Sequence, residues 1–361
     1  MGIFYDGTKL LSLKDVNGNK PEIFICTTNR SGGKTTYFNR LAVRRFLKKG
    51  EKFGLIFRYK DDLDDVASTF FSEIGEMFFP DYVMRSAQKS KGMYHELWIA
   101  KKEDDVEESE LIYKHCGYAL ALNSADKIKR KSHLLSDISA LYFDEFQSET
   151  DNYCPREVRK FKSIHTSLAR GGGKQSRYLP VYMIANPVTL LNPYYTELGI
   201  ATKLRQDTRF YRGNGFVLEQ GFNESASKAQ SESAFNRSFA SSDVQYRNYI
   251  EQGIYLNDNV AFLEKPSGRS RYICTIKYND ELYGIRSFID SGILHCDTSY
   301  DDSFKLKIAV TTNDHNVGFT MLGGNMLLIT HLRNYFEKGM FRFRDLNCKR
   351  AVMETLAYHL D

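Results

Sequence analysis

The stretch Cys26-Thr27-Thr28-Asn29-Arg30-Ser31-Gly32-Gly33-Lys34-Thr35-Thr36 decides the fold of this chain. The apolar residues 23–25 precede it and are short enough for a buried strand. A helical pattern of apolar residues follows it at Phe38, Leu41, Ala42 and Phe46. A strand, a glycine-containing loop and a helix, with Gly-Lys-Thr where the loop meets the helix, form the context of a P-loop. The stretch therefore predicts a site for nucleotide phosphates.

The residue types of this loop indicate its chemistry. Backbone N–H groups of the loop and of the helix N-terminus converge on phosphate oxygens. Lys34 is expected to reach the β- and γ-phosphates and the Thr35 hydroxyl to bind Mg²⁺. Arg30 is expected to tune phosphate binding or to reach a neighbouring subunit. The predicted cofactor-binding residues are Arg30, Ser31, Gly32, Gly33, Lys34, Thr35 and Thr36. Because Thr28 stands where the full motif has glycine, the loop needs a second, independent signal.

That second signal is an acidic pair after an apolar strand. Residues 140–143 (Ala-Leu-Tyr-Phe) predict a buried strand that ends at Asp144 and Glu145, about 110 residues after the loop. Ligands bind at the carboxyl ends of strands in open α/β sheets. We expect Asp144 to hold Mg²⁺ and Glu145 to orient and deprotonate the attacking water. An exposed acidic pair after a core strand is the alternative, which the presence of the loop disfavours.

Three further features carry a functional and a structural interpretation. Residues 178–185 predict another buried strand, so Asn186 is expected either to sense a γ-phosphate or to cap the turn before Pro187. Arg170 ends a predicted helix before the glycines 171–173, from where it would reach a neighbouring subunit's nucleotide. The basic run 127–131 faces phosphate or is a solvated loop.

Length and composition set the domain organisation. The chain has 361 residues, 42% hydrophobic and 26% charged, and a net charge of +5, too mild by itself to prove a polyanionic partner. We expect an α/β nucleotide-binding domain over 1–202, a linker or lid over 203–235 and a small α+β domain over 236–361. The six cysteines form no C-x-x-C pair, which indicates neither a zinc ribbon nor a disulfide framework. No signal peptide or membrane span is expected.

The motifs together resemble those of the DNA-packaging ATPases of phi29-like tailed phages, relatives of terminase large subunits. The matching pieces are Gly33-Lys34-Thr35, Phe57-Arg58-Tyr59-Lys60, the segment from Lys131 to Asp144-Glu145-Phe146, and Asn186-Pro187 with the later Asn192-Pro193-Tyr194. The resemblance covers about residues 20–195 well and the C-terminal part weakly.

The resemblance implies a RecA-like ASCE P-loop domain of the FtsK/HerA type, with ATP and Mg²⁺ as cofactors. It also implies a homopentameric ring that drives double-stranded DNA through the portal into a procapsid, in the host cytoplasm and transiently at the portal vertex, with a structural packaging RNA as a possible partner. By position, Glu145 resembles the catalytic base, Asn186 the coupling residue, and Lys60 and Lys131 residues near the subunit interface. Arg170 is chosen as the trans-acting arginine finger, with Lys174 and Arg177 left open.

The same resemblance implies an RNase H-like C-terminal domain. A nuclease of this type needs clustered carboxylates for two metals, whereas the candidate strand 272–278 carries Lys277 and the acidic residues 297, 301 and 302 are expected to be solvated. We therefore expect a vestigial, nuclease-inactive domain. Its basic residues contact nucleic-acid backbones or are simply solvated; they are Lys305, Lys307, Arg342, Arg344, Lys349 and Arg350. Two alternatives are a terminase-like ATPase with an active nuclease and a non-catalytic nucleic-acid-binding scaffold with a degenerate P-loop.

Overall fold

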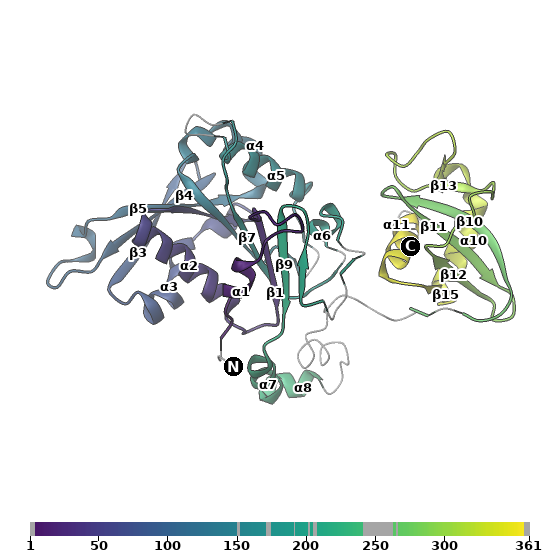
Figure 1. Ribbon diagram of the computed structural model, residues 1–361, viewed down its shortest axis with the longest axis horizontal. Coiled ribbons are helices and arrows are strands. Elements are labelled where there is room, and N and C mark those ends of the chain that lie inside the picture. Colours follow the sequence, from purple (N-terminus) through teal and green to yellow (C-terminus); the bar gives the residue numbers. More distant parts are fainter. Residues whose placement is uncertain are drawn as a thin grey trace. The chain divides into compact units, whose positions relative to one another are not determined.

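The computed structural model describes residues 4–149, 152–170, 175–190, 192–200, 203–204, 208–240, 263–264 and 266–356. The chain separates into two compact units, Met1–Asn257 and Asp258–Asp361, whose elements are labelled in Figure 1. Each unit has its own sheet and its own hydrophobic core. The sequence predicted a division into three parts.

Five of the six parallel strands form the centre of the nine-stranded sheet in the first unit, in the order β2-β6-β7-β1-β9. They are β1 (Ile23–Thr28), β2 (Lys52–Phe57), β6 (Ile138–Asp144), β7 (Val181–Ala185) and β9 (Phe216–Gly221). The strand before the P-loop, β1, and the strand that ends in Asp144, β6, are separated by β7. P-loop ATPases of the ASCE type have such an additional strand between the P-loop strand and the acidic strand. The predicted RecA-like α/β fold is therefore confirmed.

Four more strands extend the sheet at its two edges. On one side β5 (Lys114–Ala121) runs parallel to β2, and β4 (Tyr94–Lys101) and β3 (Tyr82–Lys89) follow as antiparallel neighbours. On the other side β8 (Phe210–Arg212) pairs antiparallel with β9. The apolar stretches at 96–100 and 117–122 thus belong to strands that continue the main sheet.

Helices cover both faces of this sheet (Figure 1). One core is formed with α1 (Thr8–Ser12), α2 (Lys34–Lys49) and α3 (Val66–Phe78), and the other with α4 (Ala125–Arg130), α5 (Glu157–Leu168) and α6 (Pro193–Glu197). The predicted apolar stripe of α2 is confirmed, because Phe38 and Ala42 are buried. The helices α7 (Glu224–Glu232) and α8 (Ala234–Ala240) follow β9.

Helix ends agree with the sequence in one case and differ in another. Gly50 ends α2 in the left-handed conformation at φ 68°, and its N–H donates to the Phe46 carbonyl at 2.7 Å. Asp61 precedes a helical pattern in the sequence but does not cap the next helix. The Asp62 carboxylate accepts from the Tyr59 N–H, residues 61–63 form a separate 3₁₀ turn, and α3 begins only at Val66. Leu63 of this turn is fully buried in the core.

One core strand was missed by the sequence analysis. The segment 203–235 was expected to be a linker, yet it contains β9, which pairs with β1 along its whole length. Val217 and Leu218 are fully buried there. Basic and polar neighbours hid this strand, because only four of its residues are buried and its polar end, Gln220-Gly221, breaks the apolar run.

The second unit is a small α+β fold, as expected. Its sheet has six strands in the order β14-β13-β10-β11-β12-β15. These are β10 (Ser270–Tyr278), β11 (Glu281–Phe288), β12 (Ile293–Asp297), β13 (Lys307–Ala309), β14 (Thr320–Met321) and β15 (Phe341–Phe343), packed with α10 (Met326–Glu337) and α11 (Leu346–Leu356). Asn279 and Asp280 both have positive φ and form the hairpin turn between the antiparallel strands β10 and β11.

Within the described parts of the chain, no helix is long and apolar enough to cross a bilayer.

Candidate active site

The parallel sheet brings three predicted elements to one edge. Cys26 of β1 and Asp144 of β6 both pair with Ile184 of β7, so the carboxyl ends of the three strands lie level. The P-loop leaves from β1, the acidic pair from β6 and Asn186 from β7. Side chains far apart in sequence therefore face one site.

Lys34 and Asn186 are in direct contact at this site. The Lys34 Nζ donates to Asn186 Oδ1 at 2.6 Å, and the Lys34 side chain is almost completely buried. Burial lowers the pKa of Lys34, and the neighbouring Asp144 carboxylate opposes that shift. The lysine that would hold phosphate is thus already aimed across the loop toward the tip of β7.

Asp144 and Thr35 form the oxygen pair expected to hold a metal ion. Burial raises the pKa of Asp144, while the Thr35 hydroxyl bonded to it and the Lys34 ammonium lower the pKa. A hydroxyl beside a carboxylate suits Mg²⁺, which takes few protein oxygens and keeps water and phosphate as its remaining ligands. The donor set therefore fits a magnesium–nucleotide complex.

Glu145 has an unusual backbone. Its φ is 53°, in the left-handed region that a residue with a side chain rarely adopts. Its N–H donates to Asp144 Oδ1 at 2.9 Å, and its side chain is exposed. Glu145, Asp144 and Thr35 line a cavity of about 450 Å³ that also reaches Arg58. A non-glycine residue in this conformation costs free energy, and such strain is concentrated at functional sites.

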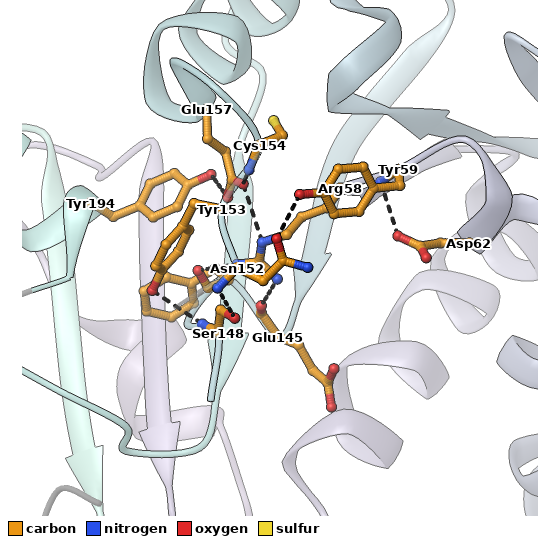
Figure 2. A network of polar contacts seen from close by, with 11 residues as sticks. Arg58, Tyr59, Asp62, Glu145, Ser148, Asn152, Tyr153, Cys154, Glu157 and Tyr194 are labelled. Carbon is orange, nitrogen blue, oxygen red and sulfur yellow. Dashed lines mark hydrogen bonds and ion pairs between the residues drawn. The ribbon is translucent and has the colours of Figure 1, made fainter. Parts of the chain in front are cut away.

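The backbone on which Glu145 sits is held by Arg58, at the end of β2 (Figure 2). Arg58 Nη1 donates to the Glu145 carbonyl and Nη2 to the Phe146 carbonyl, both at 2.6 Å. Its Nε pairs with Glu157 Oε2 at 3.2 Å. One guanidinium therefore fixes two successive carbonyls of the acidic loop, a fork that matches its planar geometry.

Glu157, the first residue of α5, anchors this arginine. Its side chain is 1% exposed and also accepts from the Tyr194 hydroxyl at 2.8 Å and the Cys154 N–H at 2.9 Å. The network in Figure 2 thus ties β2, the loop after β6, α5 and α6 together. Sequence analysis noted Arg58 only within a motif and missed Glu157. An arginine directly after a buried strand was the available signal.

The P-loop itself is held from outside by distant segments. The Tyr5 N–H donates to the Gly32 carbonyl at 2.8 Å, and Gln230 of α7 donates to the Ser31 hydroxyl at 2.7 Å. Gly33 has φ 84°, and a Cβ there would approach the Phe4 ring at 3.3 Å. The loop therefore keeps its shape through contacts outside its own sequence.

A second cavity of about 360 Å³ lies beside the P-loop, and the N-terminal segment around Phe4 and Tyr5 lines part of it. Phe4, Thr28, Arg209 and Phe222 are among its lining residues. Tyr5 and buried Glu219 also line it, and the Tyr5 hydroxyl donates to Glu219 Oε2 at 2.8 Å. A flat aromatic group fits the composition of such a space.

Comparison with known proteins identifies the family. A family model described as podovirus DNA encapsidation protein (Gp16) matches residues 1–359. The chain belongs to this family. Its resemblance to phi29-like packaging proteins is thereby confirmed, and its function is DNA encapsidation.

Curated relatives and solved structures agree with this assignment. The DNA packaging protein of Bacillus phage phi29 is 25% identical over 364 residues, covering 99% of this chain and 97% of the relative. That of Bacillus phage B103 is 24% identical over 336 residues, covering 92% and 94%. The solved structure described as the bacteriophage Phi-29 viral genome packaging motor assembly has a TM-score of 0.65 at 23% identity, covering 99% and 98% of the chains. The structure described as the Phi-28 gp11 DNA packaging motor has a TM-score of 0.57 at 14% identity. These structures share the fold.

Some predicted residues of this encapsidation protein lie outside the cleft. Lys60 is exposed in the loop after β2, Lys131 directly follows α4, and Arg170 is exposed beyond α5. None of the three lines the cavity at Glu145. The Thr36 hydroxyl donates to Glu73 of α3 at 3.1 Å and so faces away from the phosphate loop.

The alternatives for the arginine finger separate on structural grounds. Arg177 donates to the carbonyls of Ile138 at 2.6 Å and Leu168 at 3.1 Å, so its guanidinium ties the start of β6 to the end of α5. These contacts lie at the amino ends of the strands, whereas Glu145 follows the carboxyl end of β6. Lys174 lies outside the described residues. Arg170 is exposed just beyond the end of α5 and does not line the cavity at Glu145.

In the second unit, Lys277 occupies the strand where a nuclease carboxylate was expected. Its Nζ pairs with Asp280 at 2.9 Å. Among the described residues no group of three or more His, Cys, Asp or Glu side chains is placed to hold a metal ion. Asp297 was expected to be solvated, but its side chain is 15% exposed and pairs with Arg344. The basic residues are spread across the sheet, because Lys307 lies on β13, next to the edge strand β14, and Arg342 on β15 at the other edge.

Proposed function

We propose that this encapsidation protein hydrolyses ATP and couples hydrolysis to the movement of double-stranded DNA into a capsid. The observation that carries the proposal is the contact of Lys34 with Asn186, beside the bonded pair Thr35 and Asp144. Phosphate-binding, metal-binding and water-activating groups thereby meet at one edge of the sheet.

Each residue has a separate role in the proposed reaction. Bound magnesium–ATP supplies the electrophilic phosphorus, and Thr35 and Asp144 hold the metal. Lys34 and the loop amides bind the phosphates. Glu145 orients a water and accepts its proton, since its exposed carboxylate faces the cavity and its backbone is fixed by Arg58. Asn186 links the state of the phosphates to β7.

We assign the nucleobase to the second cavity, beside the P-loop. Phe222 follows β9 and Phe4 precedes the first helix, so aromatic rings are available for stacking on a base. Arg209 adds a cation at the same cavity. The placement is consistent with phosphates in the loop, because Thr28 lines this cavity and also begins the loop.

The proposed partners are those of a DNA-encapsidation motor. The chain is expected to form a homo-oligomeric ring at the portal vertex of a procapsid, with Arg170, Lys131 and Lys60 at or near subunit interfaces. Arg170 would stabilise charge on the neighbour's phosphate during transfer. Double-stranded DNA is contacted through its backbone without reading sequence, and a packaging RNA is a further possible partner.

We propose that the second unit is an RNase H-like domain without nuclease activity. Lys277 is paired with Asp280 on the strand expected to carry a metal-binding carboxylate, and two-metal cleavage needs such carboxylates. Incubating plasmid DNA with the protein and Mn²⁺ is expected to leave the plasmid supercoiled. Clear linearisation would favour the alternative, a terminase-like ATPase that still cuts DNA.

A packaging assay tests the proposed function. Procapsids with portals, DNA and ATP are mixed with the protein, and the DNA that resists DNase is measured. Wild type is expected to protect DNA, and Lys34→Ala is expected to protect none, because the loop loses its phosphate-binding cation. Glu76→Gln, an exposed change on α3, is the matched control and should behave as wild type. Protection by Lys34→Ala at the wild-type level would refute the proposal.

A further inference from the structure

One carboxylate outside the predicted site lies across the mouth of the P-loop. The Oε1 atom of Glu149 accepts from Arg30 Nη2 at 2.5 Å and from Asn186 Nδ2 at 3.4 Å. Glu149 follows β6 by a short loop, Arg30 belongs to the P-loop, and Asn186 follows β7. Two donors from different strands therefore converge on one carboxylate oxygen.

This contact extends directly to the phosphate-binding lysine. The amide of Asn186 accepts from Lys34 Nζ through Oδ1 and donates to Glu149 through Nδ2. Lys34, Asn186, Glu149 and Arg30 thus form a continuous chain in which one negative charge lies between two positive ones. The chain of contacts joins the P-loop, the segment after β6 and the end of β7.

The donors that Glu149 engages are the kind that bind phosphate. Guanidinium and amide N–H groups bind phosphate and carboxylate oxygens in the same way. The lysine of a P-loop reaches the β- and γ-phosphates. Groups that lie beyond Lys34, on the side of Asn186, would therefore meet the terminal phosphate. Without nucleotide, the Glu149 carboxylate accepts from Arg30 and Asn186 in place of the terminal phosphate.

We propose that Glu149 is an internal counter-anion that a γ-phosphate displaces, so that it determines how strongly the site distinguishes ATP from ADP. The inference rests on the proposed function. ADP has no phosphate at that position and leaves the bonds of Glu149 to Arg30 and Asn186 in place. ATP must break them and then lies close to the released carboxylate, which repels it.

Removing the negative charge of Glu149 should therefore change the affinity for ATP more than the affinity for ADP. Glu149→Gln keeps the size of the side chain but neither pairs with Arg30 as an ion nor repels the γ-phosphate. Because the carboxylate is partly exposed, the gain should have the scale of one screened charge interaction, about threefold to fivefold in affinity. ADP affinity should change less than about twofold, within the scatter of surface substitutions.

The full-length protein is titrated with ATPγS and, separately, with ADP, both in the presence of Mg²⁺. Calorimetry measures the binding in each titration. The comparison includes wild type, Glu149→Gln, Glu149→Ala and the control Glu76→Gln. Their melting temperatures are measured first, to show that all four proteins are equally well folded. The expected result is a lower Kd for ATPγS in both Glu149 variants, an unchanged Kd for ADP, and a control equal to wild type.

Three results would overturn the inference: an ATPγS affinity equal to wild type, an equal gain for both nucleotides, or weaker ATPγS binding, which would make Glu149 a ligand of the nucleotide complex. Failure of the proposed function is distinguishable from these. In that case wild type itself would not bind ATPγS, or Lys34→Ala would bind it equally well.

Discussion

Asp144 is kept in the site at a cost in stability. Burial raises its pKa although Thr35 and Lys34 both favour the ionised form. A carboxylate with a raised pKa in the folded state destabilises the fold at pH values above that pKa. The penalty disappears as the pH falls through the folded-state value toward the ordinary range of an aspartate.

Asp144→Asn is therefore expected to stabilise the nucleotide-free protein at pH 7. We expect a gain of about 1 kcal/mol in the free energy of unfolding, the scale at which sites exchange stability for activity. The gain should shrink as the pH falls, because the wild-type carboxylate becomes protonated. Denaturant unfolding at several pH values measures it. A variant less stable than wild type at pH 7 would contradict this account of Asp144.

At the same scale, the sequence predicted the residue types of the site but not their supports. Lys34, Thr35, Asp144, Glu145 and Asn186 were all named from motifs and converge at one edge of the sheet. Glu157 and Glu149 were not recognised, because a single glutamate in a polar segment has no pattern of its own. Their importance appears only when strands distant in sequence pair and bring Arg58 and Arg30 to them.

Among elements, the loop after β6 depends on the residue that directly follows β2. Arg58 holds the carbonyls of Glu145 and Phe146 and pairs with buried Glu157. The position of the proposed base is therefore set by a neighbouring strand and by the start of α5. A lysine at this position could not bind two carbonyls in a fixed fork.

Arg58→Lys should accordingly lower kcat for ATP hydrolysis by at least about tenfold, the scale of misplacing a catalytic group. KM for ATP should change little, because Lys34 and the loop still bind the phosphates. Steady-state kinetics separate the two constants, and Arg44→Lys, an exposed arginine of α2, is the matched control. A rise in KM with an unchanged kcat would assign Arg58 to binding and refute its positioning role.

Elements were predicted well where periodicity was strong and poorly where tertiary contacts decided. The strand–loop–helix of β1 and α2 and the strands β6 and β7 were all predicted from the sequence. The start of α3 was not, because Asp62 caps Tyr59 locally. The strand β9 was not, because its burial comes from pairing with β1, some 190 residues away.

For the whole molecule, two units with separate cores imply two partly independent stabilities. All residues of the proposed nucleotide site lie in the unit Met1–Asn257. A ligand stabilises only the folded unit that binds it. ATPγS with Mg²⁺ should therefore raise the melting temperature of one calorimetric transition and leave the other within about 1 °C, a shift too small to reflect a bound ligand. Equal shifts of both transitions would contradict a site confined to the first unit.

A ring would place Arg170 beside another subunit's nucleotide. Arg170→Ala subunits should still bind ATP, since Arg170 lies outside their own cavity. Mixed with wild type, they should lower ATPase activity by more than their share, because each one disables a neighbour. ATPase activity is measured as a function of the fraction of variant subunits in the mixture. Arg177→Lys is not used as a control, because Arg177 supports the fold. A linear decrease in activity would refute the finger assignment.

The most direct test of the central claim is DNA-stimulated ATP hydrolysis by wild type and Glu145→Gln. Wild type should hydrolyse ATP faster when DNA and the portal are present. Glu145→Gln should bind ATP as tightly as wild type but turn it over at least about a hundredfold more slowly, as expected for a lost general base. Hydrolysis by Glu145→Gln at the wild-type rate, or none by wild type with DNA and portal present, would contradict the account.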